Sequence, residues 1–83
     1  MRCTSWPDYK YTCTSDGGDK YESLDGSLGR WDTEKCESLC KQKGENGCCY
    51  LCWEGCGCYW KKGAAAEKSL YAEIAITCSI SGI

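Results

Sequence analysis

Cysteine thiols are the most abundant reactive groups in this chain. Ten of its 83 residues are cysteines, namely Cys3, Cys13, Cys36, Cys40, Cys48, Cys49, Cys52, Cys56, Cys58 and Cys78. A cysteine content above roughly 8–10% marks a disulfide scaffold in a short chain, and an even count lets every thiol pair. Because disulfides persist in oxidising compartments, the sequence predicts a secreted, extracellular protein.

The same thiols could instead act as metal ligands or as a redox pair. Cys49-x-x-Cys52 and its neighbours could hold zinc or copper as a thiolate cluster. The chain has no histidine, however, and no second well-spaced Cys-x-x-Cys. A redox Cys-x-x-Cys opens a helix in a βαβ unit, whereas this one lies in a predicted hairpin. We therefore expect disulfides, no metal and no cofactor.

Hydrolytic chemistry has little support in the sequence. Without histidine there is no ordinary Ser–His or Cys–His activation of a nucleophile. Carboxylate pairs such as Asp16/Asp19 and Glu22/Asp25 lie in turn-rich segments, where a solvated surface is the simpler interpretation. The protein is therefore predicted not to be an enzyme.

The charge of the chain limits the classes of molecule that it is expected to bind. The net charge is −2 and the pI is about 5.0, which argues against nucleic acid, since nucleic acid rewards clustered Lys and Arg. The same acidity argues against a basic membrane-lytic peptide. No apolar run approaches the roughly 20 residues of a membrane span.

The composition suggests a single disulfide-rich domain, 1–83, with two parts. Residues 1–30 carry the turn sequences Asp16-Gly17-Gly18-Asp19 and Asp25-Gly26, and such residues favour turns over regular structure. This part is predicted to be a loop-like N-terminal arm. Residues 31–83 are predicted to form a helix-hairpin-strand core.

The core elements follow from capping and periodicity. A helix is predicted at about 33–43, because Asp32 or Thr33 can cap its start and Gly44 can end it. Two aromatic-rich runs around a glycine-containing break predict a β-hairpin at about 48–61. The segment 64–70 is predicted to be a short helix or a loop.

Alternating apolar residues predict a half-buried strand at about 72–80. The fold class is thus small disulfide-rich α+β, with the helix clamped to the hairpin and followed by this C-terminal strand. The strand carries no charge from Ile74 to Ile80 and no proline, which makes self-association through Ile74, Ile76 and Ile80 a candidate function. The alternative is a central strand whose isoleucines fill the core.

Two pairs of cysteines have spacings that fit the predicted helix and hairpin: Cys36 and Cys40 are four residues apart, and Cys56 and Cys58 are two residues apart. Cysteines four apart on a helix share a face, as do cysteines two apart on a strand. Bridges Cys36–Cys56 and Cys40–Cys58 would then clamp the helix across the hairpin. This arrangement resembles the cysteine-stabilised αβ motif of defensins, scorpion toxins and macins, which implies a defence peptide or toxin acting on a membrane or ion channel. The pairing of the other six cysteines stays open.

A second resemblance involves the same helix. Cys36-Glu37-Ser38-Leu39-Cys40, followed by Gly47-Cys48-Cys49-Tyr50, resembles ciliate mating pheromones. These are small, acidic, cysteine-rich secreted signals that bind cell-surface receptors. The resemblance implies a non-enzymatic signalling protein, and this is the function that we expect first. The defence peptide or toxin comes second, and a self-assembling extracellular structural protein third.

Aromatic residues next to lysines form the candidate binding surface. It comprises Tyr50, Trp53, Tyr59, Trp60, Lys61 and Lys62. Aromatic anchors flanked by charge dominate binding hot spots. The alternative is that alternate residues of these strands fill the core, so that one face is buried and the other is exposed.

Overall fold

The computed structural model describes residues 1–6, 10–14, 21–29, 31–52, 57–69 and 73–80. These residues form one helix and seven strands. In chain order the elements are β1 (Arg2–Trp6), β2 (Tyr11–Cys13), β3 (Glu22–Asp25), α1 (Thr33–Gln42), β4 (Gly47–Cys52), β5 (Cys58–Lys62), β6 (Ala66–Lys68) and β7 (Glu73–Ser79).

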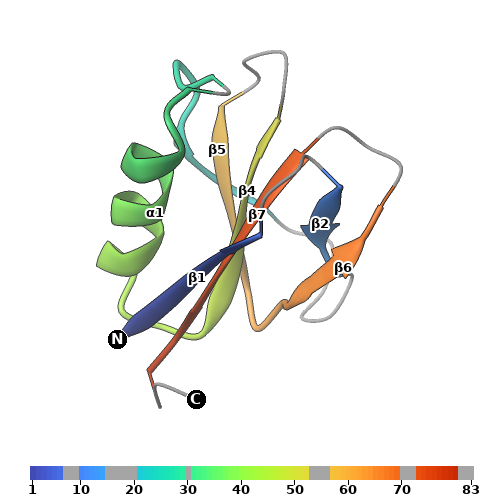
Figure 1. Cartoon of the computed structure of the whole chain (residues 1–83). Helices are drawn as coiled ribbons and strands as arrows, with labels where there is room; N and C mark the ends of the chain where they lie inside the picture. The colour runs from blue at the N-terminus through green and yellow to red at the C-terminus, as the bar shows by residue number, and fades with distance from the viewer. Residues whose placement is uncertain (7–9, 15–20, 30, 53–56, 70–72, 81–83) are drawn as a thin grey trace.

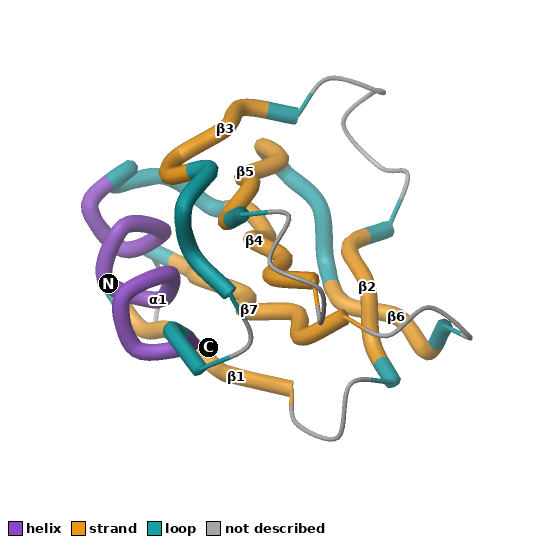
Figure 2. Tube along the Cα trace, turned by 90° about the horizontal axis from the view of Figure 1, so that it is seen from above, coloured by secondary structure: helices purple, strands orange, loops and turns teal. Residues whose placement is uncertain are grey.

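The strands form two antiparallel sheets. The larger sheet has the order β1-β7-β4-β5-β3, and the smaller one pairs β2 with β6. Helix α1 covers one face of the large sheet, and β2 and β6 lie on the opposite side (Figure 1). The same three layers are visible from above (Figure 2). The fold class is confirmed as a small disulfide-rich domain with one helix, but it is richer in sheet than a helix clamped to a hairpin.

Two separate cores fill the spaces between these layers. Because side chains alternate along a strand, β4, β5 and β7 each supply residues to both faces. The core under α1 is built mainly from Cys36, Cys40, Cys49, Leu51, Cys58, Trp60, Ile74, Ile76 and Cys78. The core under β2 and β6 contains Cys13, Cys48, Ala64 and Ala75. The large sheet is therefore covered, at least in part, on both sides.

The predicted C-terminal strand is confirmed as β7, and it lies inside the sheet. It pairs with β1 on one side and with β4 on the other. Ile76 is fully buried and Ile74 is 6% exposed. The prediction that these isoleucines form a self-association surface is therefore wrong for both, because they belong to the core under α1. Ile80 remains 62% exposed.

The predicted loop-like arm contains three strands. In β1, Arg2 pairs with Ser79 and Trp6 with Ala75, and β3 pairs with β5 in a register that shifts between Ser23 and Asp25. The segment predicted as a short helix or loop contains β6. These strands form because they pair and pack with segments that are distant in the sequence. Local composition does not reveal such partners.

The helix matches its predicted bounds closely. It begins at Thr33, after Asp32, and ends at Gln42, and Gly44 then adopts a left-handed φ of 68° that favours glycine. The Asp32 side chain does not cap α1. Its Oδ2 instead accepts a hydrogen bond from the Gly29 N–H at 2.9 Å, which closes the loop that leads into the helix.

Four disulfides join described cysteines: Cys3–Cys78, Cys13–Cys48, Cys36–Cys58 and Cys40–Cys49. The helix is thus bridged to the hairpin, but the predicted pairs Cys36–Cys56 and Cys40–Cys58 are wrong. Helix α1 lies across two strands, so one of its cysteines bonds to β5 and the other to β4. The spacing of the two helix cysteines shows that they lie on the same face of α1. It does not show which strand of the sheet lies beneath each of them. Cys56 and the side chain of Cys52 lie outside the described residues.

A tight turn after β3 predicts a pH effect. Asp25 Oδ1 accepts hydrogen bonds from the Ser27 N–H at 2.9 Å and from the Ser27 hydroxyl at 2.6 Å. The hydroxyl contributes most to lowering the pKa of Asp25 below its ordinary value of 3.8. The stabilisation is therefore present above about pH 4 and is lost as the pH falls through the lower folded-state pKa.

Ser27→Ala is expected to raise the pKa of Asp25 towards its ordinary value, because it removes the hydroxyl donor. The measurement is a carboxyl-carbon NMR titration of the folded protein. Ser23→Ala, at an exposed position of β3 two residues before Asp25, serves as the control and should leave the titration unchanged. An Asp25 pKa that does not respond to Ser27→Ala would contradict the assignment.

Candidate binding surface

The structure separates the six residues of the predicted binding surface. Strand alternation puts Tyr50, Tyr59 and Lys61 on the face opposite α1, whereas Trp60 and Lys62 project on the helix side. The pairing of β4 with β5 brings Tyr50 directly opposite Tyr59. Trp53 lies outside the described residues. The predicted set is thus not one continuous surface.

Three tyrosines form a contiguous row on the face opposite α1. The rings of Tyr50 and Tyr59 stack with centroids 5.1 Å apart and planes inclined by 17°. Tyr21, just before β3, meets Tyr50 edge-on at 5.1 Å. Offset-stacked and edge-to-face contacts at this distance stabilise aromatic pairs. We call Tyr21, Tyr50 and Tyr59 the tyrosine row.

The tyrosine row remains accessible. Tyr21 is 42% exposed, and Tyr50 and Tyr59 are half-buried. A half-buried ring that is fixed by its neighbours loses little conformational freedom when a partner covers it. The row therefore combines a large apolar area with three hydroxyl groups in a defined arrangement.

Lys61 is placed differently from its prediction. Its side chain is 2% exposed, and its ammonium lies 4.8 Å from the ring centroid of Tyr21. A cation over an aromatic face is attracted by the ring's quadrupole, and the aliphatic stem of a lysine packs well against apolar neighbours. Lys61 is therefore buried against Tyr21 and does not present its charge to a partner.

Trp60 is a core residue, 7% exposed. It packs closely against Gly47, since a Cβ added there would lie 2.6 Å from the indole Nε1. The ammonium of Lys43 lies 4.6 Å from the ring centroid and also bonds to Glu22 Oε2 at 2.7 Å. Within the described residues the indole Nε1 has no hydrogen-bond partner. Trp60 thus fills the space between sheet and helix.

Two exposed aromatic residues were not predicted as surface candidates. Trp31, in the turn that leads into α1, is 82% exposed, and Tyr21 completes the tyrosine row. Tyr21 lies in a turn-rich part of the chain, and only the pairing of β3 with β5 brings it beside Tyr50. No local sequence signal identifies that pairing. Trp31 stands beside the predicted helix start, but it belongs to no pattern that marks a surface.

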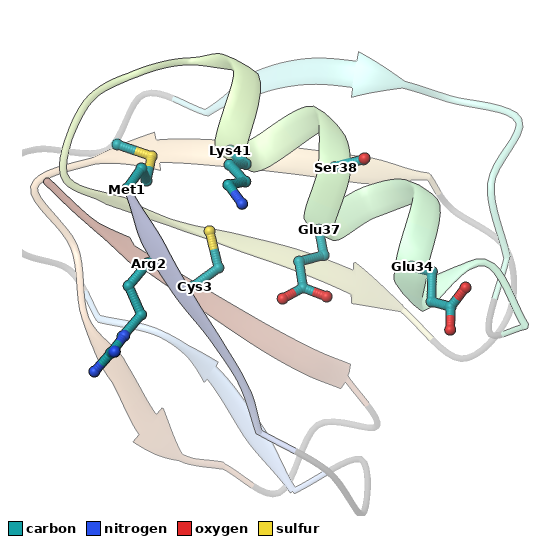
Figure 3. Close-up of a pocket in the computed structure, with 7 residues that line it drawn as sticks. All are labelled: Met1, Arg2, Cys3, Glu34, Glu37, Ser38 and Lys41. Carbon is teal, nitrogen blue, oxygen red and sulfur yellow. The ribbon is translucent and has the colours of Figure 1, made fainter. Parts of the chain in front are cut away.

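A polar groove of about 450 Å³ lies between β1 and α1. It is lined by Met1, Arg2, Cys3, Glu34, Glu37, Ser38 and Lys41 (Figure 3). The groove mixes both signs of charge, from Arg2, Glu34, Glu37 and Lys41. Its unusual component is the half-buried cysteine.

Neither a metal site nor a membrane-spanning helix occurs among the described residues. In the part of the chain that the structure describes, no group of three or more His, Cys, Asp or Glu side chains could hold a metal ion. Over the same residues, α1 is too short and too polar to cross a membrane.

No protein-family model, curated protein or solved structure matches this chain. The resemblances to ciliate pheromones and to cysteine-stabilised αβ peptides therefore stay predictions that rest on short cysteine-containing strings. The function has to be argued from the tyrosine row and from the scaffold that holds it.

Proposed function

We propose that this protein is a secreted, non-enzymatic signalling protein that binds a cell-surface receptor through the tyrosine row. The observation that carries the proposal is the row itself. Three tyrosines, two from strands β4 and β5 and one just before β3, lie partly exposed with Tyr50 in ring contact with both of the others. Tyrosine is enriched in binding hot spots, because it offers a large apolar ring together with a hydroxyl group.

The disulfides support this role by fixing the strands that carry the row. Strand β4 carries Tyr50, and its neighbouring Cys48 and Cys49 bond to β2 and to α1 respectively. Strand β5 carries Tyr59 and is bridged to α1 through the preceding Cys58. A surface that is already ordered before binding loses less entropy in the complex, so more of its contact energy becomes affinity.

The bridges are also compatible with an extracellular protein. Disulfides form and persist in oxidising compartments, and small extracellular domains use them to supplement a limited core. The four described bridges connect α1, β2 and β1 to the three central strands of the large sheet. Such a scaffold would keep its shape outside the cell.

The placement of the lysines counts against the toxin alternative. A pore-plugging lysine has to project into solvent, whereas Lys61 is 2% exposed. The side chain of Lys62 is 71% exposed, but its ammonium lies 3.7 Å from Glu45 Oε1. The net charge of −2 also does not favour anionic membranes. The structural alternative loses support as well, since Ile74 and Ile76 are in the core.

The proposal is tested by adding labelled, oxidised protein to cells of the producing species and, in parallel, to dye-loaded anionic vesicles. We expect saturable binding to the cells, displacement by unlabelled protein and intact vesicles. Vesicle leakage would favour the defence peptide. Binding that does not saturate, or that unlabelled protein does not displace, would contradict a receptor ligand.

Tyr59→Ala is expected to weaken displaceable binding by about tenfold or more, because hot-spot truncations typically cost about 1–2 kcal/mol or more. The matched control is Lys62→Ala, which alters an exposed side chain on the opposite face of the same strand. It should bind within about twofold of the unchanged protein. Circular dichroism would confirm that both variants are folded.

A third variant distinguishes the two exposed aromatic sites. Trp31→Ala should retain binding if the tyrosine row is the contact surface. If Trp31→Ala abolishes binding while Tyr59→Ala does not, the receptor contacts the turn before α1 and the tyrosine row is not the site.

A further inference from the structure

The Cys3–Cys78 bridge differs from the other described disulfides in its exposure. Seven of the eight described bridge cysteines are at most 4% exposed: Cys13, Cys36, Cys40, Cys48, Cys49, Cys58 and Cys78. Cys3 is half-buried. It lies on β1, at an edge of the large sheet, directly opposite Cys78 on β7. Among these bridges, this is the one with a half-buried cysteine that also lines a groove.

Cys3 lines the groove between β1 and α1. Cys3 points from β1 towards the helix, and the side chains of Lys41 and Glu37 extend from α1 into the same groove (Figure 3). Arg2, the neighbouring residue on β1, points away from the helix. The groove of about 450 Å³ has room for a small molecule beside the sulfur.

We propose that Cys3 is a thiol-exchange site that takes low-molecular-weight thiols from this groove. A small thiolate attacks Cys3 Sγ and forms a new S–S bond, while the bond to Cys78 breaks. The electron pair leaves with Cys78 Sγ, which then takes a proton from solvent. A second thiolate cleaves the mixed disulfide, so that two small thiols become one small disulfide and the protein bridge becomes two thiols.

The consequence for the fold is local. Reduction removes the covalent link between β1 and β7, while the bridges that hold α1 and β2 remain. Strand β1 still pairs with β7 through its backbone, and the Trp6 indole N–H still donates to Thr77 Oγ1 at 3.2 Å. The tyrosine row lies on β4, β5 and the start of β3, two or more strands away from β1. The exchange therefore loosens one edge of the sheet without dismantling that row.

The two charged side chains beside Cys3 predict opposite effects on the rate. The attacking thiolate and the sulfurs in the transition state carry negative charge, which the ammonium of Lys41 attracts and the carboxylate of Glu37 repels. Lys41→Gln should therefore slow the exchange with an anionic thiol, and Glu37→Gln should accelerate it. A unit charge near the attacking thiolate in water changes the rate on the order of two- to threefold at low ionic strength.

The first experiment exposes the oxidised full chain to increasing concentrations of reduced glutathione, quenches with iodoacetamide and maps the alkylated cysteines by mass spectrometry. We expect Cys3 and Cys78 to be alkylated at a glutathione concentration at least about tenfold below that which opens any other bridge. Alkylation of any other cysteine first, or of all cysteines together, would overturn the proposal.

The second experiment compares the exchange rates of Lys41→Gln, Glu37→Gln and, as a control on β5 and away from the groove, Lys62→Gln. The proposal requires a slower rate for the first, a faster rate for the second and an unchanged rate for the control. Equal rates in all variants would show that the thiol does not enter through this groove. Neither experiment depends on receptor binding, so its failure is distinguishable from failure of the proposed function.

Discussion

Replacing Cys36 and Cys58 together with alanine is expected to lower the free energy of unfolding by about 2–5 kcal/mol or to abolish cooperative folding. Both cysteines are completely buried, and their bridge holds the first half of α1 on β5. Its loss relaxes the constraint on the unfolded chain and leaves space in the core under the helix. Urea denaturation of the oxidised protein, followed by circular dichroism, measures the change.

Ser38→Ala is the matched control for this double variant. Ser38 lies between the two bridged cysteines of α1 but is exposed, and surface substitutions of this kind usually change stability by less than about 0.5 kcal/mol. A Cys36→Ala/Cys58→Ala protein that unfolds at the same urea concentration as Ser38→Ala would contradict the role of this bridge.

Gly57→Ala is expected to lower the free energy of unfolding by about 3 kcal/mol or more. Gly57 has a φ of 102°, which L side chains rarely adopt. A Cβ there would lie 2.7 Å from Gly26 Cα and 2.9 Å from the Asp25 carbonyl oxygen. Both are backbone atoms, so the turn after β3 would have to move away from β5. Overpacking and an unfavourable φ each cost about 1–3 kcal/mol.

Two other glycines separate these causes. Gly44 has a φ of +68° with open space around its Cα, so Gly44→Ala should cost about 1 kcal/mol through the backbone alone. At Gly26 no atom lies within 4 Å of the position that a Cβ would take, and Gly26→Ala should be close to neutral. Thermal unfolding should rank the three variants, from most to least stable, as Gly26→Ala, Gly44→Ala and Gly57→Ala. A Gly57→Ala protein as stable as Gly44→Ala would mean that this close contact is absent.

The elements with strong local signals were predictable from the sequence. Helix α1 begins next to Asp32 and ends two residues before Gly44, close to the bounds that these residues predict, although the Asp32 side chain does not cap the helix. The hairpin of β4 and β5 follows from its aromatic content, and β7 from its alternating isoleucines. In each case the residues that determine the element lie within it or beside it.

The N-terminal strands could not be predicted in the same way. Strand β1, Arg2–Trp6, has no strict apolar alternation, because an edge strand needs few buried side chains. Its order depends on pairing with β7, which lies at the other end of the chain. Strand β3 similarly depends on β5. Composition alone therefore identified the turns in this part of the chain but not the strands between them.

The binding surface was predictable in composition but not in orientation. Alternation implied that neighbouring residues such as Trp60 and Lys61 point to opposite faces. It did not show that both faces of the sheet are covered, so Lys61 could be buried despite its charge. Likewise, the cysteine spacing on α1 predicted which face of the helix is bridged to the sheet. The cysteines to which Cys36 and Cys40 bond depend on the angle at which α1 crosses the two strands.

The disulfide map of the oxidised protein tests this scaffold most directly, because the tyrosine row and the groove at Cys3 both depend on it. Proteolysis after Glu37, Glu45 and Glu54 puts Cys36, Cys40, the group Cys48/Cys49/Cys52 and the pair Cys56/Cys58 on separate peptides. Tandem mass spectrometry then assigns the linked cysteines within each cross-linked peptide. The structure predicts Cys36 bonded to Cys58 and Cys40 bonded to Cys49. Cys40 linked to Cys58, with Cys36 linked to Cys56, would contradict the placement of α1 across β4 and β5.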